Sequence, residues 1–83
     1  MPTYRAEVLE QLAVHGIRPR PETRPEVIRD YLSDLYRYEI RQLRQRLLRG
    51  EIVRRNYSGH VVRLRRRYPL LSIPVDLWTI PDG

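Results

Sequence analysis

Residues 23–49 read TRPEVIRDYLSDLYRYEIRQLRQRLLR, and this stretch decides the fold. Thr23 is followed three residues later by Glu26, with Pro25 between them, which predicts a helix with Thr23 as N-cap of a capping box. Gly50 follows the last apolar residues closely and predicts the end of that helix. At about 100° per residue, the apolar side chains fall on one broad stripe. They are Ile28, Leu32, Leu35, Tyr36, Ile40, Leu43 and Leu47.

This apolar stripe needs more cover than a small chain readily supplies. A helix of roughly 25 residues is about 37 Å long. A chain of 83 residues buries only about 60–65% of its unfolded surface, so its own core is modest. The far end of the helix must therefore lie on another helix, on the C-terminal tail or on a second copy of the chain.

The segment before this helix completes the N-terminal part of a single all-α domain that spans residues 1–83. Apolar residues at helical spacing predict a short helix over residues 3–16, with Thr3 as its cap and Gly16 in the left-handed position after it. Two prolines separated by one arginine predict an extended connector over residues 17–22.

The segment after Gly50 predicts a third helix and a tail. A narrow apolar stripe predicts a helix over residues 54–68, and the short link before it makes this helix an antiparallel neighbour of residues 23–49, in an αα-hairpin. Residues 69–83 form an apolar tail that is interrupted by prolines, and we expect it to lie extended with Trp78 as its anchor. The sequence leaves open whether this tail packs on its own hairpin or on another molecule.

Every basic side chain is arginine: there are 16 arginines, no lysine and a net charge of +6. Guanidinium groups bind phosphates and carboxylates through a planar fork of donors, so the excess charge predicts an acidic ligand. Two alternatives explain the arginines without a ligand. One is codon bias in a GC-rich genome, and the other is a solvated charged face with local ion pairs such as Asp34 with Arg37. The candidate nucleic-acid or anion contacts are Arg37, Arg41, Arg44, Arg54, Arg55, Arg63, Arg66 and Arg67.

Glu39 is the unusual carboxylate, because it falls near the middle of the apolar stripe. A carboxylate in such a position needs a partner. We expect a structural ion pair, either with an arginine of the third helix or with Arg46 of a second copy, and such a pair would fix helix register or dimer pairing.

Catalytic and metal chemistry have little support in the sequence. The chain has no cysteine, which removes thiolate nucleophiles and cysteine-based zinc sites. His15 and His60 lie on different predicted elements, neither with a second ligand at helical spacing. We therefore expect no enzyme activity, no cofactor and no metal. The absence of a signal peptide pattern and of a long apolar run predicts a cytoplasmic protein that does not enter the membrane.

The sequence thus favours a non-catalytic protein-interaction or self-association module, with another copy or another protein as partner. The alternative is a protein that binds DNA or RNA without sequence preference through its arginine-rich helix faces. No helix-turn-helix, zinc-finger or RRM signature is present, so sequence-specific recognition is not expected.

Overall fold

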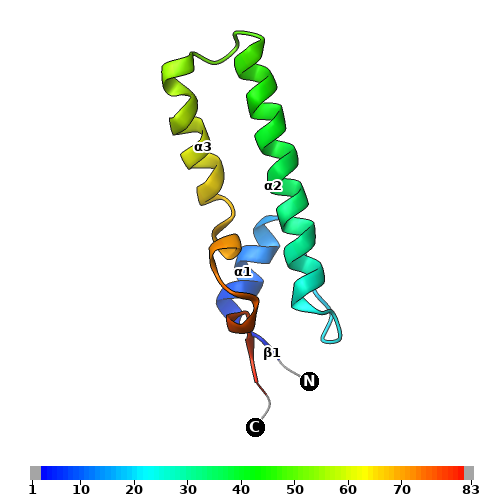
Figure 1. Ribbon diagram of the computed structural model, residues 1–83. Coiled ribbons are helices and arrows are strands. Elements are labelled where there is room, and N and C mark those ends of the chain that lie inside the picture. Colours follow the sequence, from blue (N-terminus) through cyan, green and yellow to red (C-terminus); the bar gives the residue numbers. More distant parts are fainter. Residues whose placement is uncertain (1–2, 82–83) are drawn as a thin grey trace.

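The computed structural model describes residues 3–81, and this part of the chain is mainly helical (Figure 1). The helical class expected from the sequence is confirmed. The α-helices are α1 (Ala6–Val14), α2 (Pro25–Leu48) and α3 (Tyr57–Arg66). Short 3₁₀ helices are η1 (Arg54–Asn56), η2 (Pro69–Ser72) and η3 (Val75–Leu77), and two very short strands are β1 (Thr3–Tyr4) and β2 (Thr79–Ile80).

The start of α2 differs from the predicted capping box. Arg24 is the N-cap and makes no side-chain capping hydrogen bond. The hydroxyl of Thr23 instead accepts a hydrogen bond from the backbone N–H of Arg20 at 3.0 Å. The prediction of Thr23 as N-cap was wrong because the tight turn before the helix already uses this hydroxyl.

The ends of α1 and α2 share one motif. Gly16 and Gly50 have φ angles of 73° and 78°, in the left-handed region that residues with a Cβ adopt only at a cost. After α2, the N–H of Glu51 donates to the carbonyl of Arg46 at 2.9 Å, as in a Schellman motif. Glycine therefore sets where both helices stop and lets the chain reverse there.

The N-terminal segment also begins differently from the prediction. Thr3 does not cap α1, because it lies in β1, which pairs antiparallel with β2 and places Thr3 opposite Ile80. Arg5 is the N-cap of α1 and has no side-chain cap. Its backbone N–H donates to the carbonyl of Trp78 at 3.0 Å. The two ends of the described chain are thus joined in a small two-stranded ribbon.

The C-terminal tail is not extended as predicted. It folds into η2 and η3. Pro69 is the first residue of η2, a position that suits proline because its φ is preset for a helix, and Pro74 is the N-cap of η3. The indole N–H of Trp78 donates to the carbonyl of Ile73 at 3.0 Å and holds the second turn against the first. The third helix is also shorter than the predicted 54–68, since its first turn is the separate helix η1.

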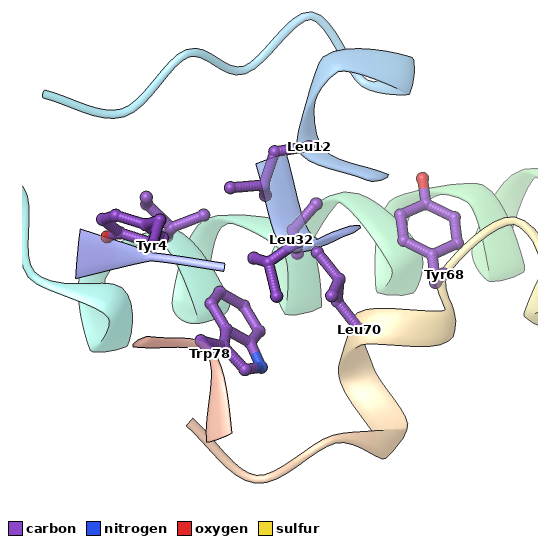
Figure 2. Packing of buried hydrophobic residues seen from close by; sticks show 8 residues of the cluster. Tyr4, Leu12, Leu32, Tyr68, Leu70 and Trp78 are labelled. Carbon is purple, nitrogen blue, oxygen red and sulfur yellow. The ribbon is translucent and has the colours of Figure 1, made fainter. Parts of the chain in front are cut away.

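The hydrophobic core lies at one end of the molecule, between α1, the first half of α2 and the tail (Figure 2). Trp78 and Leu12 are fully buried, and Leu32 is 1% exposed. The other core residues are Tyr4, Val8, Ile28, Tyr68 and Leu70. We call this part, residues 3–36 and 68–81, the base.

The rest of the molecule is a narrow arm, residues 37–67, in which α3 lies beside the second half of α2 (Figure 1). The described chain measures 53 × 17 × 16 Å, so the arm projects well beyond the base. Its buried side chains are Leu43 and Ile52, and α3 contributes no fully buried residue. Within one chain, the apolar stripe of α2 is buried at Ile28 and Leu32 by the base and at Leu43 by the arm, while Leu35, Tyr36, Ile40 and Leu47 are half-buried.

Candidate interaction surfaces on the basic arm

Charge is divided unevenly between base and arm. Residues 37–67 contain eleven arginines and two carboxylates, a net charge of +9. Residues 1–36 contain five arginines and six carboxylates, and residues 68–83 contain two carboxylates and no arginine. The remainder of the chain is therefore slightly acidic. The protein as a whole owes its basic character to the arm alone.

The eight arginines predicted as anion contacts all lie on the arm, and all are exposed. Three stand on α2, on the side away from its apolar stripe. Two form the start of η1 at the far end of the arm, and three lie in the last turn of α3 or just after it. In order, they are Arg37, Arg41 and Arg44, then Arg54 and Arg55, then Arg63, Arg66 and Arg67.

The dipole of α3 stabilises the arginines near its C-terminus and disfavours those near its N-terminus. Arg63 and Arg66 lie in the last turn of α3, where a cation is stabilised by the negative end of the helix dipole. Arg54 and Arg55 precede the positive end of the same helix, and no acidic residue lies in its first turn. Their placement is unfavourable within the chain, so their charge is available for an external anion.

Ion pairs within the arm neutralise little of this charge. Arg49 pairs with Glu51 at 2.8 Å and Arg67 approaches Glu39 at 3.6 Å. Arg37 approaches Asp34 of the base at 3.5 Å, with both side chains about three-quarters exposed, and such a pair contributes little. Within residues 3–81, no carboxylate lies within 4.0 Å of the remaining predicted contacts. These are Arg41, Arg44, Arg54, Arg55, Arg63 and Arg66.

Glu39 lies at the joint between arm and base, with its side chain 27% exposed. It accepts a hydrogen bond from the hydroxyl of Tyr68 and faces Arg67, which caps the C-terminus of α3. Its partners therefore come from its own chain. A groove between α2 and α3 is lined by Glu39, Arg67 and Arg46, the other residue predicted for this pair, and Arg46 is exposed.

Tyr68 is the central residue of this joint. Its ring stacks on His15 of the base, with centroids 4.6 Å apart, and on Tyr36 of α2, with centroids 5.4 Å apart. His15 in turn shares a hydrogen bond of 2.7 Å between its Nε2 and the carbonyl of Arg67. Burial, followed by the hydrogen bond to Glu39, raises the pKa of Tyr68 well above its ordinary value of 10.0. Tyr68 therefore stays protonated and acts as a structural hydrogen-bond donor.

Sequence reasoning missed the roles of Tyr68 and His15. Tyr68 follows Leu64 at a spacing of four on the apolar stripe of the third helix, and this position by itself indicates packing alone. The signal available was that a tyrosine, unlike leucine, can meet the predicted carboxylate at Glu39. His15 gave no comparable signal, because its contact with Arg67 joins residues 52 positions apart.

Trp78, the predicted tail anchor, lies in the core of its own chain with no exposed surface. It is therefore not presented to a partner in this conformation. In Figure 2 its ring lies close to the side chains of α1 and α2 residues, below Leu32.

An open hollow lies on the flank of α2 where the arm meets the base. Its apolar part comes from Tyr36, Ile40 and Leu71, and its rim carries Arg37 and Arg41. Among the described residues, no group of three or more His, Cys, Asp or Glu side chains is placed to hold a metal ion. None of the helices described is both long and apolar enough to cross a membrane.

No family model, no curated protein and no solved structure matches this chain. A function is therefore inferred from the geometry and charge of the chain itself.

Proposed function

We propose that the protein is a non-catalytic binding module that holds nucleic acid, without sequence preference, on its arginine-rich arm. The observation that carries the proposal is the net charge of +9 on residues 37–67 beside a slightly acidic base. A polyanion is the ligand class that such a concentrated positive charge attracts most strongly, because each phosphate contact releases condensed counterions.

The spacing of arginines along the arm suits a phosphate backbone better than a small anion. Arg54 and Arg55 lie at the far end of the arm, and Arg63 and Arg66 lie two to three turns further along α3. At 1.5 Å per residue these two pairs are separated by roughly 15 Å along the helix axis. Guanidinium groups at that separation contact several phosphates of one strand rather than a single group.

Beside its arginines, the arm exposes only three amide side chains of the type that reads base edges, Gln42, Gln45 and Asn56. The third helix, α3, presents arginine rather than asparagine or glutamine. Arginine contacts to phosphate position a protein without selecting sequence. We therefore expect similar affinity for unrelated sequences, with strong dependence on salt.

The proposal is tested by binding of the nucleic-acid-free protein to random-sequence duplex and single-stranded oligonucleotides across a series of salt concentrations. The logarithm of the binding constant should fall linearly with the logarithm of salt, by about 0.9 for each duplex phosphate contacted. Replacing Arg54, Arg55, Arg63 and Arg66 by glutamine should weaken binding and flatten this slope.

A matched control removes the same amount of charge from the base. Arg18, Arg20, Arg24 and Arg29 are all exposed, and replacing these four by glutamine lowers the net charge equally. This control should retain the slope of the wild-type chain. If both fourfold variants lose the same affinity, bulk charge and not the arm is responsible; absence of binding in dilute salt excludes the function.

Self-association, the other function that the sequence favours, needs a surface that the chain does not use for its own packing, and much of the apolar stripe packs on the base or on the arm. It draws support from a different surface, the opposite face of α2.

A further inference from the structure

The face of α2 that points away from its apolar stripe carries a second regular pattern. Its residues recur at spacings of four and three, the heptad spacing that keeps side chains on one narrow line along a helix. All seven of these side chains are exposed. We call this line the outer seam: Val27, Tyr31, Asp34, Tyr38, Arg41, Gln45 and Leu48.

The outer seam exposes large apolar and aromatic surface. Val27 is 59% exposed, Tyr31 56%, Tyr38 54% and Leu48 76%. Single exposed apolar residues need no explanation, but four at heptad positions of one helix form a contact line. The outer seam extends over both base and arm, and its side chains take part in the hydrophobic core of neither region.

Charge changes sign midway along this face. Its first half carries Glu26, Asp30 and Asp34, and its second half carries Arg37, Arg41 and Arg44. Placed antiparallel, two such faces set the acidic half of each against the basic half of the other. Placed parallel, they set like charges together, which is destabilising. The sequence order of charges on α2 thus makes the face complementary to a second copy of itself.

Contacts within the chain use only part of this charge. Asp34 approaches Arg37 at 3.5 Å and Glu26 approaches Arg24 at 3.7 Å, in pairs that are largely exposed to solvent. Within residues 3–81, no cation lies within 4.0 Å of Asp30, and no carboxylate lies within that distance of Arg41 or Arg44. These charges remain available to a partner helix.

We propose that two copies of the chain associate through their outer seams, with the two α2 helices antiparallel and related by a two-fold axis. Val27 of each copy then lies near Leu48 of the other, at both ends of a seam about 32 Å long. Tyr31 and Tyr38 lie among arginines of the opposing helix, an arrangement that favours cation–π contacts. Such a symmetric contact is self-complementary and closes at two copies.

The dimer does not depend on nucleic-acid binding. It uses Arg41 and Arg44, whereas the arginines tested for nucleic acid lie on η1 and α3. The contact is one helix wide, at the lower end of specific interfaces, near 1,200 Å² in total. We therefore expect a dimer that dissociates on dilution and weakens with salt, because opposed surface charges contribute to it.

Charge reversal of the full chain tests the pairing, with mass measured by sedimentation velocity over a range of concentrations. The variant Asp30→Arg/Asp34→Arg has a mainly basic face on which only Glu26 stays acidic, and the variant Arg41→Glu/Arg44→Glu has a mainly acidic face on which only Arg37 stays basic. Each alone should dissociate at least about tenfold more readily than the wild type. An equimolar mixture of the two variants should regain the dimer, which also shows that both are folded.

Orientation is tested by cysteine cross-linking, which is simple because the chain contains no cysteine. The single variants Val27→Cys and Leu48→Cys should not cross-link to themselves through a short thiol reagent, because in an antiparallel pair like positions lie at opposite ends. Mixed together, they should cross-link. Self-cross-linking of either variant alone would show a parallel pair and overturn the proposal.

Two other results also overturn it. One is a wild-type chain that stays monomeric at every concentration in dilute salt. The other is a dimer that persists in both charge-reversed variants, since its contact would then lie elsewhere. Neither result bears on nucleic-acid binding, whose variants alter other residues, so failure of one proposal is distinguishable from failure of the other.

Discussion

Base and arm differ in how they are held together, although α2 runs through both. In the base, Trp78, Leu12 and Leu32 have almost no exposed surface, and three chain segments surround them. In the arm, burial is limited to Leu43 and Ile52, and positive charge lies along both helices. The chain thus concentrates its buried core at one end and its positive charge at the other, and one continuous helix connects the two.

The largest effect is expected where the base is most closely packed. Trp78→Ala should destabilise the chain by about 3–5 kcal/mol, because it leaves a large cavity in a small core. That is much of the total stability of such a domain, roughly 5–15 kcal/mol. Urea unfolding followed by far-UV circular dichroism measures the loss. Leu77→Ala, at a neighbouring side chain that is 54% exposed, should stay within about 0.5 kcal/mol of wild type.

A smaller and more local effect is expected in the arm. Leu43→Ala should cost about 2 kcal/mol, since Leu43 is 8% exposed and faces little surrounding structure. Hydrogen exchange should show faster opening of the arm amides, while the emission of Trp78, the only tryptophan, stays that of a buried indole. Val62→Ala, which removes a half-exposed side chain of α3, is the control. Simultaneous loss of arm protection and Trp78 burial would contradict the division into two regions.

The joint between the regions should show its own pH dependence. Tyr68→Phe removes the donor to Glu39 and should cost about 1 kcal/mol. Because the pKa of Tyr68 is raised in the folded chain, its contribution is present below about pH 10, where unfolded tyrosine is protonated. It is lost as pH rises above that value, since the unfolded chain then releases a proton that the folded chain keeps.

Stability measured by urea unfolding should therefore fall from pH 10 upward, and fall less steeply in Tyr68→Phe. Tyr38→Phe, at a side chain that is 54% exposed, should keep the wild-type slope. An equal slope in all three chains would exclude Tyr68 as the source.

The smallest changes in stability are expected for two glycine-to-alanine substitutions in the arm, and the two changes should have opposite signs. Gly50→Ala should destabilise by about 1 kcal/mol, because its φ of 78° is costly for a residue with a Cβ. Gly59→Ala should stabilise by about 0.5–1 kcal/mol, since Gly59 is helical and an added Cβ meets nothing within 4 Å. Thermal unfolding of both variants measures the difference. The same sign in both would show that the backbone argument is wrong.

The course of α2 could be predicted from sequence because its signals are local and redundant. The stripe from Ile28 to Leu47 fixes its period, and Gly50 fixes its end. The caps at Thr3 and Thr23 could not be predicted, because each is occupied by a contact that depends on the rest of the fold. Thr3 lies in a strand whose partner is 77 residues away at Ile80, and the Thr23 hydroxyl is used by the turn before it.

For the candidate surfaces too, positions on a helix could be predicted from sequence, but contacts between distant segments could not. The positions of the arm arginines follow from helical periodicity, as does the place of Glu39 on the stripe. The identity of its partners does not, since Tyr68 reaches Glu39 only when α3 and η2 are placed against α2. The outer seam is a further case: Asp34, Arg41 and Gln45 interrupt its apolar residues, so a search for the most apolar face selects the stripe instead.

The ribbon formed by β1 and β2 has a practical consequence for anyone who handles this protein. Because Thr3 lies opposite Ile80, the two ends of the described chain share one pole, and the turn that carries Arg54 and Arg55 occupies the other (Figure 1). A tether, dye or affinity tag attached at either end therefore sits far from that turn. A molecule attached to a sensor chip by either end would keep the turn that carries Arg54 and Arg55 away from the chip surface and accessible to ligands in solution.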